Sequence, residues 1–245
     1  MQIRNTPVTG PRYWAALCVA SIFGANMGDF VSHELHMGHA NGLAPLALIF
    51  AIILFAERRL RMPTEAWYWL AIVTMRTAAT NLGDLLTHEF HIPFPAAIAG
   101  LIVALAAILL IETKVPTKTP TTGVPDTNAF YWVAMLTAGT LGTDVGDYLA
   151  GGLKLGLGLG SLILIATVVA ALALRGLPGW ATRPTYWIAV VTIRSAGTTV
   201  GDYFESRHGL NLGLPICTAF WAVVLIALLL AWRTPNRPHT AAVTA

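Results

Sequence analysis

The stretch YWLAIVTMRTAATNLGD, from Tyr68 to Asp84, decides the fold, because similar stretches occur three more times in the chain. Each copy begins with a Tyr-Trp pair, and the Asp of a Gly-Asp pair follows the Trp by 15 residues. Self-similarity at one fixed spacing is typical of repeat proteins, so we expect four copies of one structural unit. The spaced pairs are Trp14 and Asp29, Trp69 and Asp84, Trp132 and Asp147, and Trp187 and Asp202.

The intervals between the repeats divide the chain into two halves. Successive Gly-Asp aspartates are 55, 63 and 55 residues apart, so the longest interval lies in the middle. We therefore expect a first half over residues 1–116 and a second half over residues 128–245, each made of two repeats. A segment rich in Pro and Thr, residues 117–127, would be the linker between them.

The composition indicates a membrane protein. The chain is 56% hydrophobic and 11% charged, with a mean hydropathy of +0.65, whereas soluble domains are about 25% charged. Behind each copy lies a second apolar run, about long enough to cross a bilayer as a helix at ~1.5 Å per residue. The predicted fold is therefore all-α, with eight transmembrane helices arranged as four parallel two-helix repeats. The second runs are residues 42–56, 94–111, 155–174 and 212–232.

The positions of Lys and Arg predict the orientation in the bilayer. These residues gather at the termini and between repeats, while the loops within repeats carry only Lys154 and Arg207. The positive-inside rule then places both termini in the cytoplasm, with the lipid bilayer as the direct partner. The basic residues form no patch, so nucleic acid is not expected as a partner, and no feature specifies an oligomeric state.

The Tyr-Trp pairs, together with the segments MGDF, LGDL, VGDY and VGDY, resemble a known family over nearly the whole chain. This family consists of bacterial uncharacterised membrane-anchored proteins built from four tandem two-helix repeats of unknown function. The resemblance implies the same architecture and a multi-pass location in the bacterial inner (plasma) membrane. The family often carries a Glu just after an earlier Gly of its signature, where this chain has Ala25, Thr80, Thr143 and Thr198.

Seven ionisable residues fall inside the first helices of the repeats. A charge near the bilayer centre costs at least ~2.5 kcal/mol, so such residues should face the bundle interior and find partners there. Arg76 and Arg194 are equivalent, seven residues after their Trp, and Ser21 and Gly139 take this position in the other repeats. This alternation predicts a pseudo-twofold axis along the membrane normal. The seven residues are Asp29, Arg76, Asp84, Asp144, Asp147, Arg194 and Asp202.

Two interpretations of these charges remain open. The residues could line a polar cavity that forms the pathway of an ion or solute, or Arg and Asp could pair and lock the repeats together. Five Asp outnumber two Arg, so the surplus carboxylates must be hydrated, protonated or bound to a cation, which favours a site. Asp144 has no acidic counterpart in the other repeats and could be an ion ligand or a partner of either Arg.

A duplicated pattern of histidines adds a candidate metal site. His33 and His36 follow Asp29, and His88 and His91 follow Asp84, in both cases at i+4 and i+7. On an α-helix this spacing puts each set on one face, and His with carboxylate is an ordinary ligand set for zinc and similar ions. We therefore predict a metal site in the first half, with His39 as a further imidazole. The alternatives are ordinary polar residues at the outer headgroups, or proton sensing.

These features favour a small-solute transporter for a divalent metal cation, with intramembrane Asp and an outer His cluster. No cofactor is expected beyond the candidate divalent metal ion. One alternative is a transporter of an anionic or organic solute clamped by Arg76 and Arg194, and another is a non-transporting scaffold or sensor. An enzyme is not expected, because no nucleophile–base pair or cofactor motif stands out.

Overall fold

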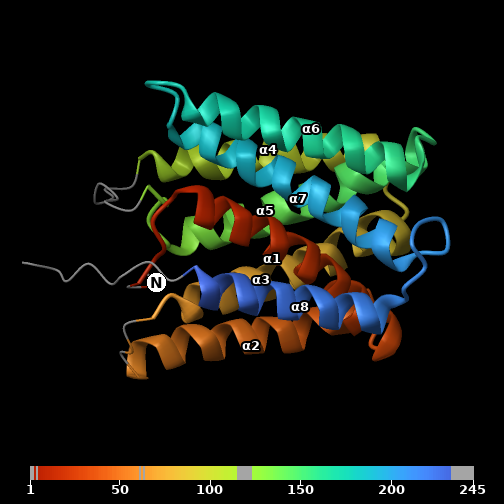
Figure 1. Ribbon diagram of the computed structural model, residues 1–245, viewed down its shortest axis with the longest axis horizontal. Coiled ribbons are helices and arrows are strands. Elements are labelled where there is room, and N and C mark those ends of the chain that lie inside the picture. Colours follow the sequence, from red (N-terminus) through yellow and green to blue (C-terminus); the bar gives the residue numbers. More distant parts are fainter. Residues whose placement is uncertain (1–2, 4, 61, 63, 115–122, 233–245) are drawn as a thin grey trace, which may run out of the picture.

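The computed structural model describes residues 3, 5–60, 62, 64–114 and 123–232, and these form eight α-helices, three short π-helices and no strand (Figure 1). The all-helical expectation is confirmed. Most of the expected linker, residues 117–127, lies outside the described residues. The α-helices are α1 Pro11–Asp29, α2 His39–Leu60, α3 Ala66–Asp84, α4 Phe94–Glu112, α5 Ala129–Asp147, α6 Gly156–Gly176, α7 Arg183–Glu205 and α8 Leu214–Ala231, and the π-helices are η1 Phe30–Glu34, η2 Leu85–Glu89 and η3 Tyr148–Gly152.

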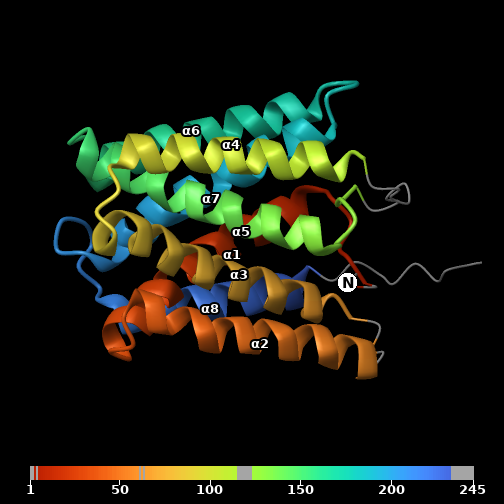
Figure 2. The same ribbon diagram turned by 180° about the vertical axis from the view of Figure 1, so that it is seen from behind.

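The helices form an inner group and an outer group. The inner helices are α1, α3, α5 and α7, which carry the Tyr-Trp pairs; α1 packs against α3 and α7, and α5 packs against the same two. The outer helices cover this group from two sides (Figures 1 and 2). Each packs on the inner helix of the following repeat: α2 on α3, α4 on α5 and α6 on α7, while α8 packs back on α1. The repeats are therefore joined into a closed ring.

The outside of the bundle is apolar. Five segments are long and apolar enough to cross a membrane by length and composition, namely α1 with η1, α2, α4, α6 and α8. Large apolar side chains such as Phe55, Val103 and Leu162 are exposed on the outer helices. Charged and polar side chains such as Arg76 and Asp144 are instead buried on the inner helices. This arrangement, apolar outside and polar inside, is that of a membrane protein.

Small residues let the inner helices approach closely. Glycines spaced by four residues recur on α1, α5 and α7, as in Gly24 and Gly28 of α1. A Cβ atom on Gly24 would lie 2.5 Å from Cγ of Arg76, and one on Gly28 would lie 2.6 Å from Cβ of Thr80. A side chain at either position would therefore push α3 away from α1. Such spacing of small residues is a common basis of helix packing in membranes.

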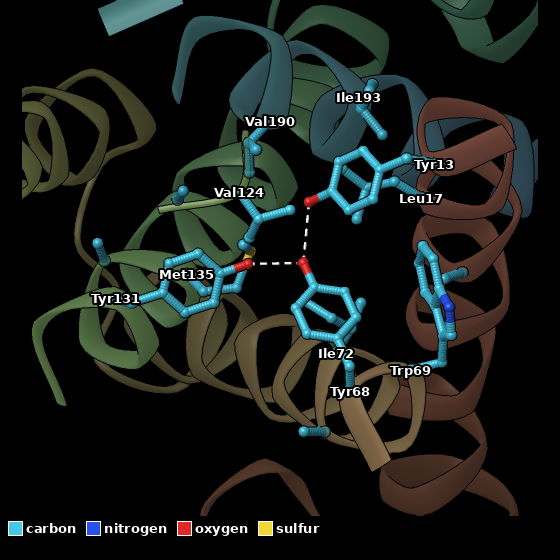
Figure 3. Packing of buried hydrophobic residues seen from close by; sticks show 14 of the residues in the cluster. Tyr13, Leu17, Tyr68, Trp69, Ile72, Val124, Tyr131, Met135, Val190 and Ile193 are labelled. Atoms are coloured by element: carbon cyan, nitrogen blue, oxygen red, sulfur yellow. Dashed lines mark hydrogen bonds between the residues drawn. The ribbon is translucent and has the colours of Figure 1, made fainter. Parts of the chain in front are cut away.

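The four tyrosines of the Tyr-Trp pairs meet between the inner helices, near the N-terminal ends of these helices. Their hydroxyl oxygens are joined into a closed ring, of which Figure 3 shows three members. Each hydroxyl group can donate one hydrogen bond and accept another, so all four are satisfied although the side chains are almost fully buried. The oxygen–oxygen distances are 2.8 Å for Tyr13 and Tyr68, 2.7 Å for Tyr68 and Tyr131, 3.1 Å for Tyr131 and Tyr186, and 2.6 Å for Tyr186 and Tyr13.

Candidate functional site

A cavity of about 630 Å³ lies where the inner helices end, at the opposite end of the inner group from the tyrosine ring. Its wall contains the aspartate of every Gly-Asp pair, so four residues far apart in the sequence share one space. Glu205 and three histidines also line it, and among the described residues its wall contains no Lys or Arg. The four aspartates are Asp29, Asp84, Asp147 and Asp202.

The local structure explains why these carboxylates converge. The α-helices α1, α3 and α5 each end at their Gly-Asp aspartate, and a π-helix follows directly. The fourth inner helix continues as an α-helix to Glu205, which brings a fifth carboxylate to the wall. One turn before three of the aspartates stands a threonine that also lines the cavity. These threonines are Thr80, Thr143 and Thr198.

The π-helices separate the predicted histidine set. Each π-turn is wider than an α-turn, and the chain then leaves the helix in a left-handed conformation, with φ of 53° at His36 and 55° at His91. The single α-helical face expected for the i, i+4 and i+7 positions is therefore not formed. His33 and His88 line the cavity, whereas His36 and His91 are exposed outside it.

Asp84 is the centre of a small Asp-His cluster at the cavity wall. Its carboxylate oxygens lie 3.6 Å from Nδ1 of His39 and 3.7 Å from Nδ1 of His88. The ring of His33 packs edge-on against that of His39, with centroids 5.4 Å apart. Zinc ligands lie about 2.0–2.2 Å from the metal, and in the described part of the chain no three His, Cys, Asp or Glu side chains are grouped to hold a metal ion.

Arg76 lies directly beneath the cavity and is held by neutral oxygen atoms. Its side chain is 1% exposed. Nε donates to the carbonyl oxygen of Ser21 at 3.3 Å. Nη1 donates to the carbonyl oxygen of Gly139 at 3.1 Å and to Oγ1 of Thr143 at 2.7 Å. Nη2 donates to the carbonyl oxygen of Arg194 at 3.3 Å and to Oγ1 of Thr198 at 2.5 Å. All four inner helices thus meet at one guanidinium group.

The other two buried charges lie apart from the cavity wall. Nη2 of Arg194 contacts Sδ of Met135 at 3.3 Å, and its Nε and Nη1 have no hydrogen-bond partner among the described residues. Asp144 is fully buried beside Gly83, and its carboxylate oxygens likewise have no hydrogen-bond partner in the described part of the chain. Neither Arg76 nor Arg194 has a carboxylate within ion-pair distance among the described residues, so the alternative in which Arg and Asp pair is not seen.

The structure thus brings four of the seven predicted intramembrane residues to one cavity, together with neighbours that the sequence did not reveal. Glu205 was missed, although it stands three residues after Asp202 and so on the same side of the helix. His39 was considered only as an additional imidazole, yet it lies about as close to Asp84 as His88 does. Its position depends on the turn between η1 and α2, which spacing along the chain does not reveal.

Comparison with known families identifies the repeating unit. The model described as "Repeat of Unknown Function (DUF347)" matches residues 12–62, 67–115, 130–176 and 185–237. The chain belongs to this family. Each DUF347 repeat supplies one inner helix, one outer helix and one cavity aspartate, which confirms the four tandem repeats and the resemblance to a repeat family of unknown function. Neither the curated proteins nor the solved structures compared with the chain gave a match.

Proposed function

We propose that this protein is a multi-pass membrane transporter for a small cation, with a divalent metal ion as the first candidate. The observation that carries the proposal is the convergence of the four Gly-Asp aspartates, one from each repeat, on a single cavity. Glu205 adds a fifth carboxylate, while the described wall contains no Lys or Arg and the nearest buried arginine is Arg76 beneath it. Carboxylates held together in a space of low dielectric repel one another, so a cation entering it is strongly favoured.

The Asp-His cluster supports a metal ion as the cation. His39 and His88 approach Asp84 from two repeats, each with a nitrogen within 4 Å of a carboxylate oxygen. Small rotations of these three side chains would bring two nitrogens and one oxygen onto one ion, which is a common zinc ligand set. In this proposal the ligands close around the ion when it arrives.

The proposed arrangement in the bilayer has eight spans, parallel repeats and a pseudo-twofold axis. The five apolar segments support it directly, and α3, α5 and α7 are surrounded by them, so their polar side chains need not meet lipid. The distribution of Lys and Arg supports cytoplasmic termini, with the cavity open to the outside. The bacterial inner membrane is proposed from the family resemblance alone.

An anionic solute is a weaker candidate. The clamp would require both arginines to reach the solute, yet neither lines the cavity. Arg76 already donates to five oxygen atoms, and Arg194 contacts Met135 on the side of the tyrosine ring. An anion in the cavity would also face five carboxylates, which would repel it.

Calorimetric titration of the detergent-purified protein with zinc, manganese, cobalt and nickel tests whether it binds a divalent metal ion. We expect at least one ion to bind, and Asp84→Asn to weaken its binding by at least ~10-fold, equivalent to about 1.4 kcal/mol. Asp144→Asn is the matched control, since it removes a buried carboxylate that does not line the cavity and should leave the affinity unchanged.

Failure of all four metals to bind would contradict the metal assignment, and the same titration with small organic ammonium ions would then test the wider proposal of a cation. Uptake of the bound ion into proteoliposomes separates transport from sensing. A scaffold or sensor would bind the ion without accumulating it, and that result would reject the transporter.

A further inference from the structure

We infer that the oxygen atoms around Arg76 form a second cation site, directly beneath the acidic cavity and shaped for a planar guanidinium group. Arg76 is its tethered occupant. This inference rests on the contacts of one side chain and not on transport by the cavity above it. We call the set of oxygens the guanidinium cage. It consists of the carbonyl oxygens of Ser21, Gly139 and Arg194 and the hydroxyl oxygens of Thr143 and Thr198.

The guanidinium cage matches the group it holds atom for atom. An arginine side chain has five N–H donors in a fixed planar fork, and the cage presents five oxygen acceptors. The acceptors come from α1, α5 and α7, so they surround the group from three sides while α3 supplies the stem. An ammonium group has only three donors and no plane, and it would leave acceptors unused.

The two threonines are oriented toward the guanidinium group by the same carbonyls that bind it. Oγ1 of Thr143 lies 3.4 Å from the carbonyl oxygen of Gly139, and Oγ1 of Thr198 lies 3.3 Å from that of Arg194. Each hydroxyl donates its proton there and turns its lone pairs toward Arg76. The cage is therefore preorganised, since its hydroxyl groups are already aimed when no guanidinium is bound.

The cage is connected to the cavity. Thr143 and Thr198 line the cavity and also accept hydrogen bonds from Arg76, so a solute in the cavity lies next to residues of the cage. On the other side Gly24 leaves room for the stem, because even a Cβ there would lie 2.5 Å from Cγ of Arg76. Shortening Arg76 to Ala would therefore leave a space of matching shape that opens toward the carboxylates.

Arg194 provides an internal comparison, because it holds the equivalent position in the fourth repeat and has no such cage. It is fully buried, contacts only the sulfur of Met135 through Nη2, and leaves Nε and Nη1 without a hydrogen-bond partner among the described residues. Under the proposed pseudo-twofold arrangement, the place of Thr143 would be taken for Arg194 by Ala25, which has no hydroxyl group. The sequence difference at this one position favours Arg76 as the occupant.

Chemical rescue tests the inference. Arg76→Ala removes Cγ, Cδ and the guanidinium group, and ethylguanidinium restores the same atoms. We expect millimolar ethylguanidinium to raise the Tm of purified Arg76→Ala in a saturable manner, with binding at least ~10-fold tighter than to the wild type, whose cage is occupied. Arg194→Ala is the matched control and should not respond. Ethylammonium, which lacks the planar fork, should have little effect on either variant.

An equal response of the two variants, or no response of Arg76→Ala, would overturn the inference. If Arg76→Ala does not fold, a double-mutant cycle of Thr143→Val and Arg76→Lys replaces it. The cage predicts that Thr143→Val lowers the Tm more when residue 76 is Arg than when it is Lys, and equal losses would contradict it. Metal binding by the wild type is measured separately. A result against the guanidinium cage can therefore be distinguished from a result against cation binding in the cavity.

Discussion

At the scale of single residues, Thr143 connects the buried Arg76 with the acidic cavity. It accepts a hydrogen bond from the buried Arg76 and lines the acidic cavity one turn before Asp147. A hydrogen bond to a charged group contributes more than one between neutral groups, and losing it leaves part of the charge unsatisfied. The residue is therefore a link between the core of the bundle and the site.

Thr143→Val keeps the shape of the side chain and removes one of the two acceptors of Nη1 of Arg76. We expect it to lower the free energy of unfolding by about 2 kcal/mol, measured by denaturant unfolding in detergent. Thr137→Val is the control on the same helix, because its hydroxyl bonds only to the carbonyl of Val133 at the exposed side. A similar loss in the free energy of unfolding for both variants would show that the hydrogen bond to Arg76 adds no extra stability.

The tyrosine ring gives a second prediction for single residues. Tyr131→Phe removes one hydroxyl group and leaves the neighbouring hydroxyls of Tyr68 and Tyr186 each with one partner fewer, in a buried place. The expected loss of stability is ~1–3 kcal/mol. Tyr148→Phe, outside the ring, should change the free energy of unfolding by less than ~0.5 kcal/mol. Unfolding curves of the two purified variants against the wild type decide between these outcomes.

Some of these residues could be predicted from the sequence and others could not. The four aspartates were found because their spacing repeats, and repeated spacing becomes proximity when equivalent helices pack against one another. The partners of Arg76 could not be found in this way, since three of them are backbone carbonyls that any residue carries. Arg–Asp pairing was the alternative interpretation, and the count of five Asp against two Arg favoured a site over it.

At the scale of helices, the predicted starts of three outer helices agree with the structure, whereas the histidine positions differ from the prediction because of local backbone geometry. The outer helix α4 begins at Phe94 as expected, and α6 and α8 begin within two residues of their predicted starts. The π-helices were not predicted, because an extra residue in a turn leaves the hydrophobic pattern nearly unchanged. Their consequence is large, since they direct His36 and His91 away from the aspartates on which the metal prediction depended.

The inner helices are in such close contact that one added methyl group should lower the stability of the bundle strongly. Gly142→Ala would place Cβ 2.8 Å from the backbone carbon of Arg194 and even closer to its Cβ, so α5 and α7 must separate. We expect a loss of at least ~2 kcal/mol in the free energy of unfolding. Gly100→Ala on α4 has nothing within 4 Å of the added carbon and should be neutral or stabilising by up to ~1 kcal/mol. Equal behaviour of the two variants would contradict the tight packing.

At the scale of the whole molecule, the cavity and the loops between repeats lie at opposite ends of the bundle, and this arrangement makes the proposed topology testable. Gly151 lines the cavity, whereas Ala181 is exposed in the turn between α6 and α7. In intact cells we expect a membrane-impermeant maleimide to label Gly151→Cys, and to label Ala181→Cys only after permeabilisation. The two native cysteines, Cys18 and Cys217, are replaced by Ser in the background. The reverse labelling pattern would invert the proposed orientation.

Each outer helix packs on the next repeat, and α8 packs on α1, so every repeat has the same kind of neighbour on both sides. A chain opened at another junction between repeats, with its old termini joined, would keep every neighbour and should fold to the same bundle. A single two-repeat half would instead present two uncovered faces, which a second copy in the same orientation could cover. The packing is therefore that of four two-helix units closed into a ring and joined into one chain. Within this ring the repeats differ at equivalent positions, since Ala25 stands where the other three have threonine and only two of the four carry an arginine at the position of Arg76.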